Sequence, residues 1–406
     1  MKILVFSTLY PSQSRPRHGI FVETRLRQIL GAYPVEARVV APVPYFPFAG
    51  VHFGRYADLA RTPRADVRHG IEVIYPRYPA PPKVGMTAAP FLLAAAMLEP
   101  LRGVMAHGFD FNLIDAHYFY PDGVAAALLG RWLGKPVVIT ARGSDINLFP
   151  SFAVPRWLIR WAAREAAAII TVSDALRQSL LELDVEAGRI TVLRNGVDTE
   201  FFCPQPRSKA RQAIGFTPLD GCLAVSVGNL VPLKGHDLAI QACTSIPRLY
   251  LAIIGSGELE EPLKSLARML GADRVHFVPE VEQERLRSFY SAADLLVLAS
   301  EREGMPNVVL EALACGTPVV ATTVGGVPEV VDSPAAGRLT LERTPEALAR
   351  EIVTLLAEPP KREDVRAHAL RLSWTETVAG IYKVFSTVLE TDSTASLVRR
   401  ARRTVS

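Results

Sequence analysis

Short apolar runs separated by helical patterns recur through the first half of the chain. The runs that fit buried strands are 3–8, 38–43, 71–75, 113–118, 137–142, 168–173 and 190–195. Apolar residues at helical spacing predict helices over 19–30, 121–133 and 154–167. Because strands and helices alternate, the pattern favours a parallel sheet with helices on both faces. Residues 42–82 interrupt it with many Pro, Arg and aromatic residues, and we interpret this stretch as a functional loop or a mobile lid.

The same alternation begins again after a break at residues 201–217, where Pro204 and Pro206 bracket polar residues. Strand-like runs follow at 223–228, 250–255, 275–279, 295–300 and 318–323, and a last helical pattern covers 373–389. The sequence therefore predicts an α/β protein of two doubly wound Rossmann-like domains that face each other across a cleft. We place the domains at 1–203 and 204–372, a further helix at 373–390, and a basic, disordered tail at 391–406.

Charge is unevenly distributed along the chain, although the net charge is only +4. Residues 1–200 carry 22 Lys and Arg against 17 Asp and Glu, residues 201–390 carry 19 against 23, and the residues from 391 onward carry 4 against 1. A net charge this small gives no reason to expect nucleic acid as a partner. The basic first half fits either an anionic membrane surface or ordinary surface charge, and both interpretations stay open.

Neither the cysteines nor the apolar stretches indicate secretion or a membrane span. The four cysteines are Cys203, Cys222, Cys243 and Cys315. They show no close pairing or metal-ligand spacing, which suggests a reducing cytosol. The start of the chain is too short before Pro11 for a secretory leader. The longest apolar stretch, 86–98, is shorter than the roughly 20 residues of a spanning helix, so we predict a buried or interfacial helix that ends at Glu99-Pro100.

Two carboxylates, Glu303 and Glu311, flank a turn between a predicted strand and a predicted helix. Pro306 fits the first turn of that helix, whose pattern runs over 307–315 and stops at a glycine. Because the preceding strand ends at residue 300, Glu303 lies at a carboxyl edge, where open α/β sheets bind ligands. A glycine-containing loop before a helix N-terminus can bind an anion, and carboxylates accept hydrogen bonds from hydroxyl groups. The stretch therefore suits a hydroxyl-rich ligand.

Four stretches together resemble the retaining GT-B glycosyltransferases of family 4. They are RNGVDTEFF at 194–202, VGNLVPLKGHD at 227–237, IIGSGE at 253–258 and the segment 303–311. The resemblance covers nearly the whole chain and implies a nucleotide-sugar donor in the second domain and an acceptor on the first. The implied acceptor is a saccharide or lipid-linked sugar in cell-surface polysaccharide or glycolipid synthesis. The resemblance also implies that the departing diphosphate takes the acceptor proton, and that the last helix crosses back onto the first domain.

The same resemblance assigns donor-binding roles to named residues. Lys234 is the expected cation for the diphosphate, Glu303 contacts hydroxyls of the transferred sugar, and Glu311 contacts those of the ribose. Lys234 and Glu303 are the catalytic candidates. The other donor-binding candidates are Asn229, Gly255, Val281, Gly304, Met305, Pro306, Asn307, Val308 and, in the first domain, Gly19. Asn229 stands where the family usually has arginine, so it brings no charge to the phosphates, and Gly19 fits a plain helix start as well.

Three polar residues at predicted strand ends of the first domain are the acceptor-side candidates. His117 is either a residue of the cleft or a core histidine. Arg142 stands where many relatives have histidine, and its guanidinium could bind an anionic group. Asp145 either receives an acceptor hydroxyl or caps the following turn.

The chain offers no clear ligands for a metal and no clear acid–base pair. It contains no Asp-x-Asp pair, so a carboxylate-held divalent metal has no evident ligands, and the resemblance implies a reaction without metal or other cofactor. Two alternatives on the same scaffold are an NDP-sugar epimerase and an inactive nucleotide-sugar-binding protein. The epimerase needs acid and base side chains at the sugar carbon, and no clear pair is visible.

Residues 152–161, FAVPRWLIRW, combine aromatic and basic side chains. This composition fits peripheral contact with an anionic membrane surface. For a cytoplasmic protein, that surface is the inner face of the membrane. A buried helix with arginines on its exposed side explains the same residues, and both interpretations stay open.

Overall fold

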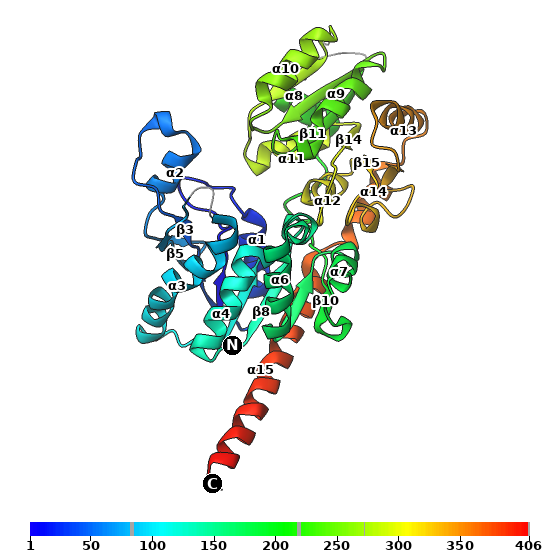
Figure 1. Cartoon of the computed structure of the whole chain (residues 1–406). Helices are drawn as coiled ribbons and strands as arrows, with labels where there is room; N and C mark the ends of the chain where they lie inside the picture. The colour runs from blue at the N-terminus through cyan, green and yellow to red at the C-terminus, as the bar shows by residue number, and fades with distance from the viewer. Residues whose placement is uncertain (82–84, 217–220, 272, 405–406) are drawn as a thin grey trace. The chain divides into compact units, whose positions relative to one another are not determined.

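The computed structural model describes residues 1–81, 85–216, 221–271 and 273–404, and the chain divides into two compact units. Unit 1 comprises Met1–Arg194 and Glu376–Ser406, and unit 2 comprises Asn195–Thr375 (Figure 1). The sequence places these boundaries at 203/204 and 372/373. The first boundary lies earlier because residues after Asn195 are fastened to unit 2, where the Arg366 guanidinium donates to the carbonyls of Phe202 and Thr199 at 2.7 and 2.6 Å.

Unit 1 is built on an eight-stranded sheet of order β10-β9-β8-β7-β1-β2-β5-β4. Its strands are β1 (Lys2–Phe6), β2 (Glu36–Val40), β4 (Ala65–Arg68), β5 (Ile71–Ile74), β7 (Leu113–His117), β8 (Val137–Ala141), β9 (Ala168–Thr171) and β10 (Ile190–Val192). Neighbouring strands of this sheet pair in parallel, except that β4 and β5 pair antiparallel. The order reverses between β1 and β7, which places a ligand crevice at the carboxyl ends of these two strands in a sheet of this kind.

Helices and short elements of unit 1 follow the alternation that the sequence predicts. They are α1 (Ile20–Ala32), η1 (Val51–Phe53), α2 (Arg55–Arg61), α3 (Gly85–Ala106), η2 (Phe119–Gly123), α4 (Val124–Leu133), α5 (Ser144–Asn147), η3 (Phe149–Ser151), α6 (Ala153–Glu165), α7 (Asp174–Leu181) and η4 (Ala187–Arg189). Residues 42–82, which the sequence describes only as a loop or lid, contain η1, α2, the antiparallel edge strand β4, β5, and the two-stranded sheet of β3 (Val43–Pro44) and β6 (Arg77–Tyr78).

The predicted end of the apolar helix at Glu99-Pro100 is wrong, because α3 continues to Ala106 with Pro90 and Pro100 inside it. Leu93, Met97, Leu101 and Val104 form one buried stripe that passes Pro100, so packing against unit 1 outweighs the hydrogen bond that proline removes. Within the described residues, one helical stretch, Met86–Ala106, is long and apolar enough to cross a membrane by length and composition, and 33% of its apolar 18-residue segment is buried in the structure.

Unit 2 is built on a six-stranded parallel sheet of order β13-β12-β11-β14-β15-β16. The strands are β11 (Cys222–Val227), β12 (Leu249–Ile254), β13 (Val275–Val278), β14 (Leu295–Leu298), β15 (Val319–Thr322) and β16 (Gly337–Thr340). The helices are α8 (Arg207–Ile214), η5 (Pro232–Lys234), α9 (His236–Thr244), α10 (Glu260–Met269), α11 (Gln283–Ala292), α12 (Asn307–Ala314), η6 (Val327–Glu329), α13 (Pro345–Ala357) and α14 (Arg362–Leu370). The sequence predicts five of these strands and misses β16.

One face of this sheet packs against α9, α10 and α13 through an apolar cluster that includes Leu251, Leu295, Ile240 and Ile352. The opposite face contacts α11 and α12, and α8 packs against α11. Both units are therefore α/β layers around parallel sheets, which confirms the predicted fold class. The order reverses between β11 and β14, so unit 2 has its own candidate ligand edge at their carboxyl ends.

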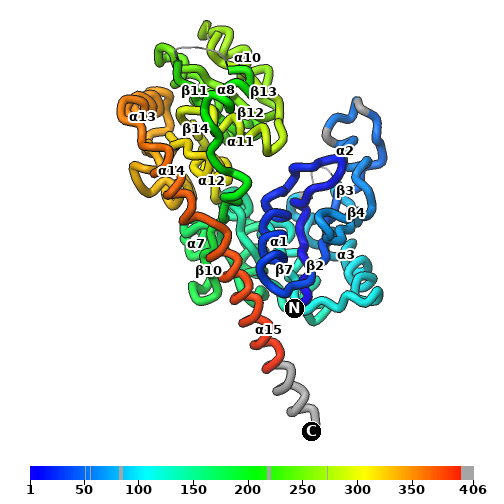
Figure 2. Tube along the Cα trace, turned by 180° about the vertical axis from the view of Figure 1, so that it is seen from behind, coloured from blue at the N-terminus to red at the C-terminus, as the bar shows by residue number. Residues whose placement is uncertain are grey.

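The last helix, α15 (Trp374–Thr404), belongs to unit 1 from Glu376 onward. Figure 2 shows α15 beside α1 within unit 1. Tyr382 stacks on Tyr33 at the end of α1 with ring centroids 4.2 Å apart, and Gly380 lies against Leu193. The sequence predicts a disordered tail from residue 391, whereas the structure continues the helix through Thr404. The segment contains no Gly or Pro that would end a helix. Residues 405–406 lie outside the described residues.

Candidate functional site

Lys234 and Glu303 meet at the carboxyl edge of the unit 2 sheet. Lys234 ends η5, which follows β11, and Glu303 lies in the loop after β14. The Lys234 Nζ lies 2.6 Å from Glu303 Oε1, and the Ser300 hydroxyl donates to the same oxygen at 2.7 Å. Their side chains are 22% and 10% exposed, so the pair is shielded but still open to solvent on one side. The reversal of strand order between β11 and β14 is what brings these distant loops together.

Gly235 is the position that allows the two loops to pack this closely. It has φ of 63° and begins α9, and a Cβ atom there would lie 2.2 Å from the Ala299 carbonyl oxygen. Only glycine fits such a contact and such a φ without a shift of the backbone. The Arg343 Nε also donates to the Ala299 carbonyl at 3.0 Å, so a second cation lies at this strand end. Sequence reasoning missed Arg343, because it follows β16, the strand that the apolar pattern missed.

The helix α12 begins beside Glu303 and carries Glu311 in its second turn. Pro306 occupies the N-cap with φ of −79°, one position before the first turn that the sequence predicts. Gly304, Met305 and Pro306 are buried. The backbone N–H groups of Asn307 and Val308 donate no hydrogen bond within the described part of the chain, as is usual for the first turn of a helix. They can serve an anion at this end of α12.

Glu311 is a half-buried carboxyl group held by one neighbour. The Tyr290 hydroxyl, itself fully buried, donates to Glu311 Oε2 at 2.9 Å. Burial raises the pKa of Glu311 to about 7, although the hydrogen bond from Tyr290 works in the opposite direction. The other oxygen, Oε1, accepts none from the residues that the structure describes. One acceptor atom therefore remains for a ligand hydroxyl.

The other donor-binding candidates of unit 2 lie in the loops at the same edge. Asn229 is exposed directly after β11, and its carbonyl accepts from the Val231 N–H at 2.9 Å. Gly255 follows β12 with φ of 153°, and a Cβ atom there would lie 2.0 Å from the Gly228 carbonyl oxygen. Val281 is half-buried in the loop between β13 and α11. The sequence-predicted residues of this unit thus gather around β11, β12, β13 and β14.

The acceptor-side candidates of unit 1 join a buried network of charges. The Arg142 Nη2 donates to His117 Nδ1 at 2.6 Å, and His117 Nε2 lies 3.1 Å from Asp115 Oδ2. Arg25, from α1, donates to both Asp115 oxygens at 3.3–3.4 Å. Burial is the main cause that lowers the pKa of His117 to about 3, so the ring is neutral at physiological pH. These contacts fit the core-histidine alternative.

The Asp145 side chain binds backbone groups of neighbouring residues and does not face the solvent. It is fully buried and accepts from the backbone N–H groups of Phe119 at 2.7 Å and Gly143 at 2.7 Å, and from that of Arg142 at 3.1 Å. Both carboxylate oxygens are engaged, which fits the capping alternative. Burial raises the pKa of its carboxyl group.

Gly19 also has a structural explanation, since a Cβ atom at its φ of 71° would lie 2.3 Å from the backbone of Leu9. Asp122, which the sequence analysis missed, fixes the turn after β1 by accepting from the Thr8 N–H at 2.6 Å. It is fully buried, and burial raises its pKa to about 7. The apolar pattern could not identify Asp122, because its partner is 114 residues earlier in the chain.

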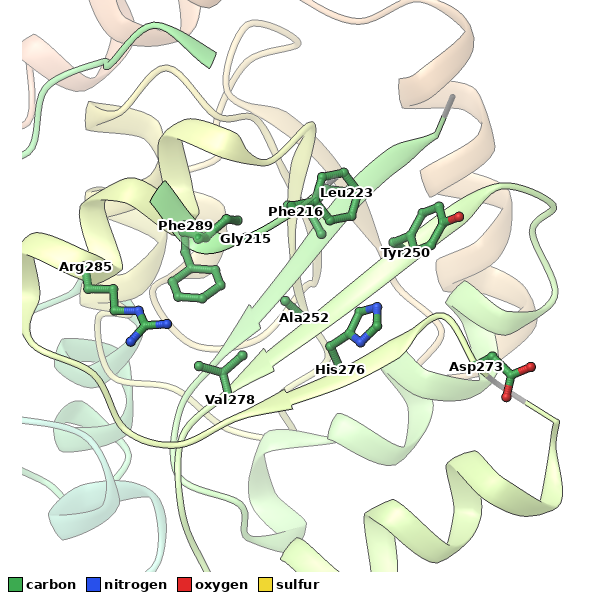
Figure 3. A pocket seen from close by; sticks show the side chains of 11 residues that line it. Gly215, Phe216, Leu223, Tyr250, Ala252, Asp273, His276, Val278, Arg285 and Phe289 are labelled. Carbon is green, nitrogen blue, oxygen red and sulfur yellow. The ribbon is translucent and has the colours of Figure 1, made fainter. Parts of the chain in front are cut away.

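A separate cavity of about 420 Å³ lies on the face of the unit 2 sheet (Figure 3). Leu223, Tyr250, Ala252, His276 and Val278 line it from β11, β12 and β13, and Phe289 and Arg285 line it from α11. None of the predicted site residues lines this cavity. No group of three or more His, Cys, Asp or Glu side chains that could hold a metal ion is found among the described residues.

Two family models match the chain in succession. The model for Glycosyltransferase Family 4 matches residues 35–201, and the model for Glycosyl transferases group 1 matches residues 209–371. A D-inositol 3-phosphate glycosyltransferase of Acidothermus cellulolyticus is 35% identical over 342 residues, which cover 78% of this chain and 74% of the relative. TuaC of Bacillus subtilis, named as a teichuronic acid biosynthesis glycosyltransferase, is 34% identical over 80% of this chain and 82% of its own.

Solved structures share the fold at lower identity. Sucrose-phosphate synthase from Thermosynechococcus elongatus superimposes with a TM-score of 0.78 at 19% identity, over 96% of this chain and 99% of that one. HepE from Anabaena, in complex with UDP, superimposes with a TM-score of 0.73 at 24% identity, over 95% and 100% of the two chains. These likenesses concern the arrangement of both sheets and their helices.

The Glu311→Gln variant tests whether burial disfavours the ionised form of the Glu311 carboxyl group. A folded-state pKa of about 7, above the ordinary 4.5, means that the protonated form favours folding below pH 4.5 and that this contribution is lost as the pH rises through 7. The neutral amide avoids that loss. We expect the variant to match the wild type near pH 4.5 and to exceed it in unfolding free energy at pH 8 by up to about 3 kcal/mol.

Urea unfolding at both pH values measures this difference. Glu284→Gln, at an exposed position of α11, is the matched control and should show no such dependence on pH. Equal destabilisation of Glu311→Gln at both pH values would show that the residue acts through its hydrogen bond to Tyr290 alone.

Proposed function

The chain belongs to glycosyltransferase group 1 / family 4, whose members are retaining enzymes of GT-B fold, and from that premise we propose its substrates and site. The enzyme moves a sugar from a UDP- or GDP-linked donor to a saccharide or lipid-linked acceptor. The product is a cell-surface polysaccharide or glycolipid. The observation that carries the proposal is the Lys234–Glu303 pair at the strand-order reversal of unit 2.

The Lys234 ammonium is the group that meets the donor diphosphate. It lies at the strand edge where ligands of open α/β sheets bind, as do the N–H groups of Asn307 and Val308, which donate no hydrogen bond to any residue that the structure describes. Negative charge grows on the diphosphate as the sugar leaves, and a fixed cation stabilises that charge most in the transition state. Glu303 supplies the counter-charge to Lys234 in the structure. A bound diphosphate takes over that role and leaves Glu303 to accept from sugar hydroxyls.

Ribose recognition is the part we assign to Glu311. Its Oε2 is held by Tyr290 while Oε1 remains available, so the carboxylate is oriented before the ligand arrives. The backbone from Gly304 to Val308 lies between this residue and Glu303 and contacts the sugar and phosphates. Gly255 and Val281 line the slot for the base through their backbone, and Asn229 donates to a phosphate oxygen without charge.

We assign no metal and no protein base to the reaction. Departure of the diphosphate and attack of the acceptor occur on the same face, and the diphosphate oxygen takes the acceptor proton. His117, Arg142 and Asp145 shape the acceptor side of unit 1 indirectly, by holding the loops at the strand ends in place. HepE was solved with UDP and with UDP-glucose, and sugars linked to UDP are therefore the first donors to test.

Replacement of Lys234 by alanine tests the proposed site. A thermal-shift panel of UDP-glucose, UDP-galactose and GDP-mannose first selects the donor, because a ligand that binds the folded state raises the unfolding midpoint. We expect Lys234→Ala to lower kcat for sugar transfer by roughly 10²-fold or more, the scale of losing one electrostatic stabiliser. Lys264→Ala, at an exposed ion pair of α10, is the matched control and should leave kcat unchanged.

Other outcomes distinguish the alternatives on this scaffold. A near-normal kcat in Lys234→Ala would exclude its role at the diphosphate. Conversion of the donor to its epimer without transfer would identify an epimerase. Donor binding without turnover on any acceptor would identify an inactive binding protein.

Peripheral attachment to the inner face of the membrane is the localisation we propose. Phe152, Val154 and Trp157 expose 43%, 43% and 64% of their surface at the start of α6, next to Arg156. Apolar and aromatic side chains beside arginine suit the headgroup region of an anionic bilayer. Arg160 contributes less charge, because Asp184 pairs with it at 2.6 Å.

Co-sedimentation with vesicles of phosphatidylglycerol and phosphatidylcholine measures this attachment. We expect Trp157→Ala and Arg156→Glu each to lower the bound fraction severalfold, and high salt to lower binding of the wild type. Leu341→Ser, at a 90% exposed apolar residue of unit 2, is the control and should bind like the wild type. Binding that survives high salt and both α6 substitutions would contradict the proposal.

A further inference from the structure

The segment between β10 and α8 is attached to both ends of the helix α12 in unit 2. The Arg366 guanidinium donates to the Thr199 carbonyl at 2.6 Å and to the carbonyl of Ala314, the last residue of α12, also at 2.6 Å. At the other end of the helix, the Asn195 side chain is hydrogen-bonded to Asn307, its first residue. The segment therefore lies along α12, although none of its own residues has a role in the donor site proposed above.

The backbone beside Asn195 is fixed by the residues that lead into α15. The Val197 N–H donates to the Leu372 carbonyl at 3.0 Å, and Val197 also forms an isolated parallel bridge with Ser373. Asn195 itself is only 8% exposed. Because its backbone is held and its side chain is buried, the Asn195 amide has little freedom to leave α12.

One hydrogen bond determines which way the Asn307 side chain faces. The Asn195 Nδ2 donates to Asn307 Oδ1 at 2.9 Å. The oxygen and the NH₂ group of a side-chain amide point in different directions, so this contact turns the Asn307 NH₂ group away from Asn195. Within the described part of the chain, that NH₂ group donates no hydrogen bond, and neither do the backbone N–H groups of Asn307 and Val308. Side-chain and backbone donors are thus available together at the first turn of α12.

We propose that Asn195 is a positioning residue for donor binding, which holds Asn307 Oδ1 and thereby directs the Asn307 NH₂ group to the anionic part of the nucleotide-sugar. The inference rests on the proposed transferase function, which places the donor diphosphate at this edge of unit 2. An NH₂ group adds donors to the N–H groups that already favour an anion at a helix N-terminus. Without Asn195, the Asn307 amide can rotate and present its oxygen, which only accepts, to the same anion.

The affinity for a nucleoside diphosphate measures the effect of Asn195→Ala. Isothermal titration with UDP and with GDP identifies the nucleotide that the wild type binds more tightly, and this nucleotide is the probe for every variant. We expect Asn195→Ala to raise its Kd about fivefold, the scale of one hydrogen bond between neutral groups. Asn112→Ala is the matched control, because Asn112 Oδ1 accepts from the Lys2 N–H at 2.7 Å in unit 1. It also removes an asparagine hydrogen bond and should leave the Kd unchanged.

A double-mutant cycle separates positioning from a general effect on the fold. We expect Asn307→Ala to raise the Kd at least as much as Asn195→Ala, because it removes the amide that meets the ligand. In the Asn307→Ala background, Asn195→Ala should change the Kd by less than about twofold, since Asn195 acts only through Asn307.

Asn195→Asp keeps the test decisive if Asn195→Ala does not fold. The carboxylate has the shape of the amide but has no hydrogen to donate to Asn307 Oδ1. The same cycle applies, and the change in Kd in the Asn307→Ala background measures the effect of the new charge alone. We expect Asn195→Asp to raise the Kd by a larger factor with Asn307 present than without it.

An unchanged Kd in Asn195→Ala, or an equal rise with and without the Asn307 amide, would overturn the inference and leave the transferase function standing. Loss of folding in both Asn195→Ala and Asn195→Asp would also overturn it, by assigning Asn195 a structural role. Failure of the wild type to bind either nucleotide would instead contradict the proposed function, and the inference with it.

Discussion

The contact between Lys234 and Glu303 depends on the strand order of one sheet. The two residues are 69 positions apart, and they meet at 2.6 Å because β11 and β14 are neighbours whose connections leave in opposite directions. Gly235 allows the loop after β11 to approach the end of β14 until the backbones touch. Within unit 2, the first N–H groups of α12 and the oriented carboxyl of Glu311 lie along the same edge. A change that shifts β11 against β14 would therefore disturb each of these groups at once.

Unit 1 uses its own strand-order reversal differently. There the strand ends carry buried, hydrogen-bonded charges, in which Arg25 and Arg142 converge on His117 and Asp115. Such a network costs free energy to bury and is stable only when its members are paired, so it fixes the loops rather than offering open ligand groups. The two units thus share an architecture and differ in what they expose at the strand ends.

Apolar runs were sufficient to predict most of both sheets, because a strand buried on both faces must be apolar throughout. They missed β16, whose sequence Gly337–Thr340 includes an exposed arginine, and the antiparallel edge strand β4, which is largely polar. They ended α3 too early, because a proline rule based on hydrogen bonding takes no account of the buried stripe that continues past Pro100.

The residues of the candidate site also divide into those that sequence reasoning could identify and those that it could not. Glu303, Glu311 and Lys234 were accessible to sequence reasoning, because each lies directly after a recognisable strand or on the following helix. Asp122 and Arg343 were not, because their importance depends on partners far away in the chain. Asp145 was identified, but only the structure shows that backbone N–H groups occupy both of its oxygens.

A crystal structure of the enzyme with a bound nucleoside diphosphate tests the central claim most directly. Our account predicts the diphosphate at the carboxyl ends of β11 and β14, with Lys234 Nζ moved from Glu303 Oε1 to a phosphate oxygen and the ribose within hydrogen-bonding distance of Glu311. A nucleotide bound instead in the cavity between Tyr250 and Arg285, with the Lys234–Glu303 pair intact, would contradict it.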